Sequence, residues 1–400
     1  MKAFGPLALL FVALFNSILG LSVLFPILGP LGRQLGFSEL QVGALSTSYA
    51  LAQFVASTYW GRRSEVVGRK PILLLGILGF GVTFLMFALL CQLGLRGELN
   101  GSALFACLLL TRVVGGTFSS ATLPTAQAYV ADVTGRSDRT RSMALIGAAF
   151  GLGVVFGPAL GALLAPLGLL VPVYVSAGLA FLNAIFVWLK LPEPPRRPSQ
   201  RQAAPRLMPV LNKVRVLLAI GFTTTLASVA MEQTIAFYFQ DRLGLSNSDA
   251  ARTVGFALVA YGIMAVLVQG VFVRRVGWSP LRLMRTGVPI AAAGLVALSL
   301  AHVHSWLVVA MTLQGLGQAL TLPGVMSGLS LSVDEDEQGA VAGLNSSSQA
   351  LARTLGPVLG TGLYQLRPEL PYLFGAALLV CVLGFLIASR NALAFRLQAP

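Results

Sequence analysis

Apolar residues fall in long blocks along this chain, and short polar segments separate the blocks. Each block holds roughly 20 residues, which as a helix can cross a hydrocarbon layer about 30 Å thick. Twelve such windows lie at residues 6–28, 41–60, 71–93, 103–129, 142–165, 169–190, 214–240, 250–272, 283–301, 305–330, 340–364 and 372–389. The pattern predicts an all-α membrane protein with twelve transmembrane helices.

One polar segment, 191–213, divides the twelve windows into two sets of six. It is rich in proline and basic residues, a composition typical of a semi-flexible linker and not of a folded unit. We therefore expect an N-terminal six-helix bundle at 1–190, a cytoplasmic linker at 191–213 and a C-terminal six-helix bundle at 214–400.

Short sequences in the first half recur in the second half. The glycine-framed loop 61–71 recurs at 270–280, shifted by 209 positions. Thr122-Leu123-Pro124 recurs at 321–323, and Gly157-Pro158-x-Leu160-Gly161 recurs at 356–360, both shifted by 199 positions. A loop near residue 98 that is ten residues longer than its counterpart explains the change of shift. The repeats predict two pseudo-symmetric bundles, an arrangement typical of secondary transporters, whose substrate site lies between the repeats.

The charge of the chain supports a membrane location. Only 10% of residues are charged and 56% are hydrophobic, whereas a soluble domain has about 25% charged residues. The net charge of +14 raises the possibility of nucleic-acid binding. However, with a cytoplasmic N-terminus only five of the 28 Lys and Arg residues fall on the outer side, two lie deep within the membrane and 21 fall on the cytoplasmic side. This asymmetry follows the positive-inside rule, so it predicts two cytoplasmic termini and no nucleic-acid partner.

Three charged residues lie well inside the windows, away from their ends: Arg112, Glu232 and Arg353. Charge at this depth is costly, so such residues usually face a cavity and have a function. Glu232 is the only acid well inside a window, and a carboxyl group partly removed from water can bind and release a proton near neutral pH. We predict that Glu232 couples transport to protons. A fixed ion pair with Arg112 or Arg353 is the alternative, and Arg353 could equally bind an anionic group or be structural.

Other polar and aromatic side chains in the windows could line a cavity of mixed character, which suits amphipathic substrates. The candidates, together with Arg353, are Asn16, Tyr49, Gln53, Gln127, Tyr238, Tyr261, Gln314, Gln318, Asn345 and Gln349. Each of them alone could instead hold neighbouring helices together.

Opposite charges on the predicted cytoplasmic loops suggest a gate. Basic residues precede the third window, and acidic residues precede the eleventh. The first set is Arg62, Arg63, Arg69 and Lys70, and the second is Asp334, Glu335, Asp336 and Glu337. A second set would pair Arg274, Arg275, Arg282 and Arg285 with Asp132 and Asp138. We hypothesise that these charges hold the cytoplasmic side shut. Alternatively, the acids only complement a helix N-terminus, and exposed pairs contribute about 0–1 kcal/mol each.

Glycines and a proline mark the fifth window. Gly153, Gly157 and Gly161 are four positions apart and share one helix face, where a neighbouring helix can approach closely. Pro158 removes one backbone hydrogen bond and is expected to kink this helix.

Signatures of enzyme chemistry are missing from the sequence. It holds no nucleophile elbow, phosphate-binding loop, metal-ligand cluster or carboxylate pair. Cys91, Cys107 and Cys381 fall in apolar windows at no metal-ligand spacing. We therefore predict no enzyme activity, no metal, no cofactor and no nucleotide-driven pump.

The whole chain resembles the major facilitator superfamily, and within it the twelve-span drug:proton antiporters that include tetracycline exporters. The resemblance rests on four motifs. Gly61, Gly68, Arg69 and Lys70 match a loop motif in which Glu65 replaces the usual Asp. Leu19-Gly20-x5-Pro26 matches a motif of the first span, in which Gly29 replaces a second proline. Arg112 and Gly116 match a motif of the fourth span. Gly153-x3-Gly157-Pro158-x2-Gly161 matches a motif of the fifth span, in which Ala144 and Ala162 replace the outer glycines.

The resemblance implies efflux of a small amphipathic compound or drug by alternating access, coupled to inward proton flow. It implies a proton-coupling role for Arg112 and a leak-tight contact between bundles for the glycine face, which could otherwise be ordinary helix packing. The expected partners are a small-molecule substrate, protons and the lipid bilayer, with a monomer in the bacterial cytoplasmic membrane. A sugar, amino acid, siderophore or lysolipid as cargo remains the alternative, as does uptake by symport.

Overall fold

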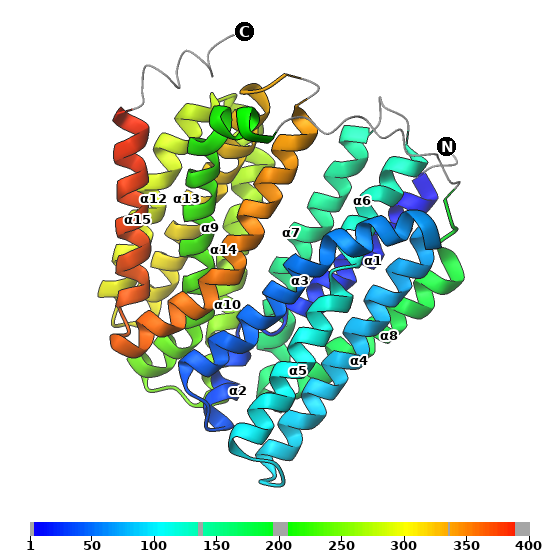
Figure 1. Cartoon of the computed structure of the whole chain (residues 1–400). Helices are drawn as coiled ribbons and strands as arrows, with labels where there is room; N and C mark the ends of the chain where they lie inside the picture. The colour runs from blue at the N-terminus through cyan, green and yellow to red at the C-terminus, as the bar shows by residue number, and fades with distance from the viewer. Residues whose placement is uncertain (1–3, 135–138, 195–206, 335–336, 389–400) are drawn as a thin grey trace. The chain divides into compact units, whose positions relative to one another are not determined.

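A computed structural model of the chain describes residues 4–134, 139–194, 207–334 and 337–388, and all regular structure in these ranges is helical (Figure 1). The elements are α1 (Phe4–Ser22), α2 (Leu28–Gln34), α3 (Glu39–Val67), α4 (Arg69–Leu95), α5 (Gly101–Ser119), α6 (Thr122–Val133), α7 (Arg139–Leu164), the 3-10 turn η1 (Ala165–Leu167), α8 (Val171–Lys190), α9 (Leu207–Leu243), α10 (Asn247–Leu267), the π-helix η2 (Val268–Phe272), α11 (Val273–Val276), α12 (Pro280–Leu300), α13 (His304–Leu331), α14 (Gln338–Leu366) and α15 (Leu370–Ala388). The predicted all-α fold is confirmed.

Ten helical segments in the described ranges are long and apolar enough to cross a membrane. The segment 101–133 counts once, although α5 and α6 are separated by a break at residues 120–121. The break comes four residues before Pro124, whose missing N–H removes a helical hydrogen bond at that point. The second and eleventh windows lie in α3 and α14, which are 29 residues each but are not among the ten. The count of twelve spans therefore stays a prediction for these two more polar helices.

The first window extends beyond its helix. We predicted one span over 6–28, but α1 ends at Ser22 and a turn over residues 23–27 leads into the short α2. Pro26 lies inside this turn and Pro30 lies in the first turn of α2, where a proline is tolerated. Hydrophobicity alone did not reveal this break, because the turn residues are almost all apolar and buried.

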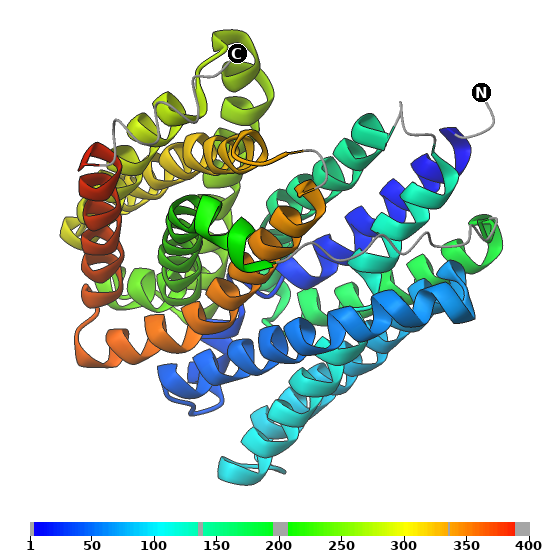
Figure 2. The ribbon, with the colours of Figure 1, turned by 45° about the horizontal axis from the view of Figure 1, so that its top comes forward.

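The chain divides into two compact units. Unit 1 holds residues 1–200 with 245–256, and unit 2 holds residues 201–244 with 257–400. Within unit 1, α1 packs against α6, α7 and α8, while α4 packs against α5 and α8. Within unit 2, α9 packs against α13, α14 and α15, while α12 packs against α13 and α15 (Figure 2). Because α9 and α12 follow the linker as α1 and α4 follow the N-terminus, each unit repeats the same helix pairing.

Two glycines end equivalent helices in the repeated loops. Gly68 lies between α3 and α4 with a φ of 124°, and Gly277 follows α11 with a φ of 57°. Both angles favour glycine, because a Cβ atom would strain the backbone there. The two residues are the 209-position counterparts seen in the sequence, so both copies of the loop have a glycine at positive φ, although their ψ angles differ, at 156° and 34°.

Candidate functional site

A cluster of polar side chains surrounds Glu232 in the interior of unit 2. Ser228 lies one helical turn before Glu232 on α9, and its hydroxyl lies 3.2 Å from Glu232 Oε1. The same hydroxyl lies 2.6 Å from Gln318 Oε1 on α13 and 3.2 Å from the Tyr261 hydroxyl on α10. Tyr261 also donates a hydrogen bond to Gln318 Oε1. Three predicted residues, Glu232, Tyr261 and Gln318, are thus brought together through a serine that the prediction did not include.

A cationic group completes this cluster. Arg353 on α14 interacts electrostatically with both Glu232 and Tyr261. The arginine is exposed, whereas Glu232 is half-buried. The cluster therefore combines one acid, one base and three neutral hydrogen-bonding groups on four helices, a composition suited to a group that binds and releases a proton.

Two further predicted residues face α9 from α14. Gln349 accepts a hydrogen bond from Thr225, and its amide nitrogen lies 3.2 Å from where a Cβ atom on Gly221 would be. Asn345 Oδ1 lies 4.0 Å from the same point. Both side chains are half-buried at the contact between α9 and α14, as expected of residues that hold two helices together.

Gln314 and Tyr238 lie deep inside unit 2. Gln314 on α13 is fully buried, and neither its amide nitrogen nor its amide oxygen has a hydrogen-bond partner among the described residues. Tyr238 on α9 is also fully buried, and its hydroxyl donates to the carbonyl of Ser299 at 3.0 Å. Their role as cavity residues stays a prediction.

Arg112 on α5 is the buried cation of unit 1, with 6% of its surface exposed. Its guanidinium lies 4.4 Å from the centre of the Tyr49 ring and 5.5 Å from that of Phe87. Its Nε donates one long hydrogen bond, 3.5 Å, to the carbonyl of Leu45. In the ranges that the structure describes, no carboxylate lies within ion-pair distance of Arg112. The arginine is therefore held by aromatic faces, and no described acid of its own unit neutralises it.

The glycine contact next to Arg112 has a partial counterpart in unit 2. Gly116 on α5 lets α3 approach so closely that a Cβ atom would overlap the carbonyl of Tyr49. Gly315 on α13, 199 positions later, packs against the ring of Tyr261, with 2.6 Å from the absent Cβ to the ring. Residue 311, the equivalent of Arg112, is a methionine. Both glycines thus contact a tyrosine, through its backbone in unit 1 and through its ring in unit 2, but only in unit 1 does the helix of the glycine carry an arginine four positions earlier.

The remaining cavity candidates of unit 1 are spread over three helices. Asn16 on α1 donates a hydrogen bond of 3.2 Å to the carbonyl of Leu179 on α8, so it links two helices. Gln53 on α3 is half-buried and Gln127 on α6 is exposed. The structure does not gather these three with Tyr49 into one cluster as close as that around Glu232.

The loop motif between α3 and α4 forms a polar cluster centred on Arg69. Arg69 Nε donates to Asp132 Oδ2 on α6 at 2.7 Å, and its Nη1 donates to Ser64 Oγ at 2.6 Å. Glu193, which follows α8, accepts hydrogen bonds from the backbone N–H groups of Arg69 and Lys70 at 2.6 and 2.8 Å. A carboxylate at this position satisfies free N–H groups and complements the positive end of the α4 dipole.

The segment that carries Glu193 is fixed at a second point. The hydroxyl of Tyr129 on α6 donates a hydrogen bond of 2.8 Å to the carbonyl of Pro192. The Tyr129 ring is fully buried, so it gives this contact a rigid base. The start of the predicted linker is therefore part of unit 1.

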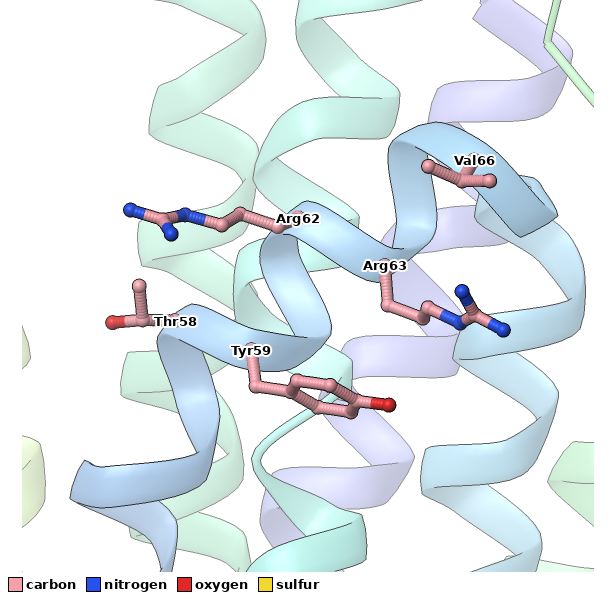
Figure 3. Close-up of a pocket in the computed structure, with 5 residues that line it drawn as sticks. All are labelled: Thr58, Tyr59, Arg62, Arg63 and Val66. Carbon is pink, nitrogen blue, oxygen red and sulfur yellow. The ribbon is translucent and has the colours of Figure 1, made fainter.

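The other charged residues of the loop motif are on the surface. Glu65 is exposed and, in the part of the chain that is described, forms no ion pair, so Ser64 takes the place next to Arg69. Arg62 and Arg63 follow Gly61 on α3 and border a shallow pocket with Thr58, Tyr59 and Val66 (Figure 3). Their guanidinium groups point in different directions in this view.

The acidic residues of the hypothesised gate bind within their own units. Asp132 pairs with Arg69, as described above. Lys213 Nζ on α9 lies 2.7 Å from Glu337 Oε2 and 3.9 Å from Asp334 Oδ2. The hydrogen bond from Lys213 lowers the pKa of Glu337. Glu335, Asp336 and Asp138 lie outside the described residues, as does the side chain of Arg274.

The glycine face of α7 packs against α1 inside unit 1. A Cβ atom on Gly153 would lie 2.8 Å from the Ile18 side chain, and one on Gly161 would lie 3.0 Å from the Val23 carbonyl. One on Gly157, next to the intrahelical Pro158, would overlap Ser22 Oγ. This contact corresponds to the helix-packing alternative. Gly356 and Gly360 make the equivalent contact between α14 and α9, against Val229 and Ala230.

Sequence reasoning missed Ser228 and Glu193 for different reasons. Ser228 is four positions before Glu232, so helical spacing places both on one face and could have identified it. Glu193 acts on residues 69 and 70, and no local pattern connects positions so far apart.

Comparisons with known proteins point to the same family as the sequence motifs. The chain matches a family model described as Major Facilitator Superfamily over residues 10–303 and 278–393. It is 25% identical to Multidrug resistance protein 1 of Bacillus subtilis, covering 96% of this chain and 95% of that one. It is 28% identical to Tetracycline resistance protein, class C, of Escherichia coli, covering 96% of each. The solved structure of nucleoside transporter NupG shares the fold, with a TM-score of 0.76 over 96% of this chain and 99% of that one, at 12% identity.

Proposed function

Since this chain belongs to the major facilitator superfamily, a family of membrane transporters, we propose that it exports a small amphipathic compound in exchange for protons. The protein would expose its substrate site to each side of the membrane in turn. Relatives of nearly full coverage are named for multidrug and tetracycline resistance, which supports efflux as the direction and drug-like molecules as the cargo.

The polar cluster around Glu232 is the observation that carries the proton-coupling part of the proposal. A transporter that uses a proton gradient needs a group that is ionised on one side of the cycle and neutral on the other. Glu232 is an acid inside a predicted span, it accepts a hydrogen bond from Ser228, and Arg353 acts on it electrostatically. Neutral hydrogen-bonding partners can serve both protonation states, which a fixed ion pair cannot do as well.

Arg112 in unit 1 also supports the proposed proton coupling. The cation lies between the rings of Tyr49 and Phe87 and has no acidic partner in ion-pair distance among the described residues of its unit. Such a group can respond to the charge of a substrate or a proton-carrying residue, because its own charge is not already neutralised. We propose that Arg112 takes part in coupling by this electrostatic route.

The distribution of basic residues supports a location in the bacterial cytoplasmic membrane with both termini in the cytoplasm. In that orientation the end of unit 1 that carries Arg62, Arg63 and Arg69 faces the cytoplasm. The protein would act as a monomer, since each chain carries both repeats.

Reconstitution into liposomes tests the proposal. With an imposed pH gradient, the wild type is expected to accumulate its substrate from a panel that includes tetracycline, a quinolone, an organic cation and an organic anion. Glu232→Gln is expected to abolish accumulation driven by the gradient while retaining exchange of substrate for substrate, because Gln cannot ionise. Glu98→Gln, at an exposed loop position, is the matched control and should transport like the wild type.

The results separate the parts of the proposal. Accumulation by Glu232→Gln equal to that of the wild type would show that this acid is not the coupling site. Transport that is unaffected by the gradient in the wild type would refute proton coupling altogether. Accumulation of sugars or amino acids, with no drug transported, would favour the alternative cargo.

A further inference from the structure

One hydroxyl group in unit 2 connects an acid to an amide. Ser228 Oγ lies 3.2 Å from Glu232 Oε1 and 2.6 Å from Gln318 Oε1. Tyr261 is within reach of the serine at 3.2 Å and donates to the same amide oxygen. Ser228 is fully buried, so water does not compete for its hydroxyl.

The number of hydrogens limits what this group can do. A serine hydroxyl carries one hydrogen and two lone pairs, so Ser228 can donate to Glu232 or to Gln318 but not to both. It can still accept a hydrogen bond while it donates one. The amide oxygen of Gln318 has two lone pairs, and Tyr261 occupies one of them.

The charge of Glu232 decides between the two arrangements. An ionised carboxylate accepts only, and it is a stronger acceptor than an amide, so the serine hydrogen turns to Glu232. The amide oxygen of Gln318 then accepts a hydrogen bond only from Tyr261, and its second lone pair is free. A protonated Glu232 can donate to Ser228 Oγ, the serine hydrogen turns to Gln318, and both lone pairs of the amide oxygen are occupied.

We propose that Ser228 is a positioning residue that transmits the protonation of Glu232 to Gln318, so that the Gln318 amide oxygen is open to substrate only while Glu232 is ionised. A substrate that uses this oxygen must carry an N–H or O–H donor. The inference rests on the proposed role of Glu232 and adds a reason why a proton and a substrate exclude each other without sharing an atom.

Other groups around Glu232 set the conditions of this switch. Arg353 approaches from α14 and is the charged neighbour that acts on the carboxyl group. Tyr261 approaches from α10, and α13 contributes the uncharged Gln318. Tyr372 on α15 is hydrogen-bonded to Thr234, two residues further along α9. Arg353 influences the pH at which the switch operates, whereas Ser228 connects the carboxyl group to the amide by hydrogen bonds.

Difference infrared spectroscopy tests the switch without knowledge of the substrate. The full chain in liposomes is compared in acidic and alkaline buffer. The carboxyl C=O band that Glu232→Gln removes reports the protonation of Glu232, and the side-chain amide signal that Gln318→Leu removes reports Gln318. In the wild type both signals are expected to titrate together. In Ser228→Ala the carboxyl band should remain and the Gln318 signal should be lost.

Two further variants control for structure. Ser228→Thr restores a hydroxyl and should restore the Gln318 signal, which a loss of folding could not explain. Tyr261→Phe removes the other donor to Gln318 but leaves the serine link, so both signals should still titrate together.

Each outcome has a distinct meaning. A Gln318 signal that persists in Ser228→Ala, or that is missing in the wild type while the carboxyl band is present, overturns the switch and leaves the proton site intact. A carboxyl band that Glu232→Gln does not remove overturns the proton site itself.

Discussion

Replacing Gly157 with alanine perturbs a very close contact between α7 and α1 in unit 1. The new methyl group would overlap Ser22 Oγ and would lie 2.8 Å from the carbonyl oxygen of Leu19. Ser22 cannot simply rotate away at no cost, because its hydroxyl donates a hydrogen bond of 2.8 Å to the carbonyl of Gly153 on α7. Part of the obstacle is backbone, so α1 and α7 must separate locally.

The size of the effect follows from three contributions. Inserting a methyl group into a packed contact costs about 1–3 kcal/mol. Loss of the hydrogen bond from Ser22 to Gly153 costs about 1 kcal/mol. Alanine is favoured over glycine inside a helix by about 1 kcal/mol, which offsets part of this cost. We therefore expect Gly157→Ala to destabilise unit 1 by about 1–3 kcal/mol.

Thermal unfolding of the detergent-purified protein, followed by intrinsic fluorescence, measures this loss. Gly151→Ala is the matched control on α7, because nothing lies within 4 Å of where its Cβ atom would be. That variant should be as stable as the wild type or more stable by up to about 1 kcal/mol. The expected difference between the two alanine variants is thus about 1–4 kcal/mol.

A double variant adds a second check. Ser22→Gly removes the nearest obstacle, so Gly157→Ala should be less damaging in that background, with only the carbonyl of Leu19 left in the way. If Gly157→Ala unfolds at the same temperature as Gly151→Ala and transports equally well, the tight contact between α1 and α7 is not as described.

Three further predictions follow from contacts in the two units. Gly356→Ala is expected to cost about 1–3 kcal/mol, since its new methyl group would lie 2.7 Å from Cγ1 and 2.9 Å from Cβ of Val229, and rotation of the valine moves only the first of these atoms; the same unfolding measurement should place it below the wild type. Glu193→Ala removes the carboxylate at the start of α4 and should cost about 0.5–2 kcal/mol, whereas Glu98→Ala should cost almost nothing; equal unfolding temperatures would contradict a capping role. Lys213 lowers the pKa of Glu337, so this pair stabilises the fold above the unfolded-state pKa of Glu337. The stabilisation disappears as the pH falls through the lowered pKa of the folded state. Lys213→Met should remove this part of the acid sensitivity in unfolding curves recorded across that pH range.

Much of the fold could be predicted because its causes are local or periodic. Apolar windows set the helices, since each span must bury its backbone polar groups within itself. The recurrence of Gly68 at Gly277, and of Gly157 at Gly356, predicted two related units because close backbone approach and positive φ both restrict the residue type. Glu232 stood out for a similarly simple reason, since an acid in an apolar window needs an explanation.

The rest depended on contacts between distant parts of the chain. The turn that ends α1 is apolar, so it resembles the helix that it interrupts. Loop charges could be assigned to a side of the membrane but not to a partner, and Asp132 binds Arg69 of its own unit. Whether Gln314 faces a cavity or is enclosed by its neighbours depends on how α13 is rotated about its axis. The pattern of apolar residues in the sequence does not fix this rotation to within one residue.

The start of α4 has a consequence for the order in which the protein is made. In the second repeat, the corresponding helix start is capped by Ser279, whose side chain accepts from the N–H of Arg282 only three residues later. In the first repeat the cap is Glu193, which is synthesised 124 residues after Arg69. α12 can therefore complete its N-terminus as soon as it leaves the ribosome, whereas α4 must wait until α8 and the residues that follow it have been made. Unit 1 closes this end last, with the residues that lead into the linker.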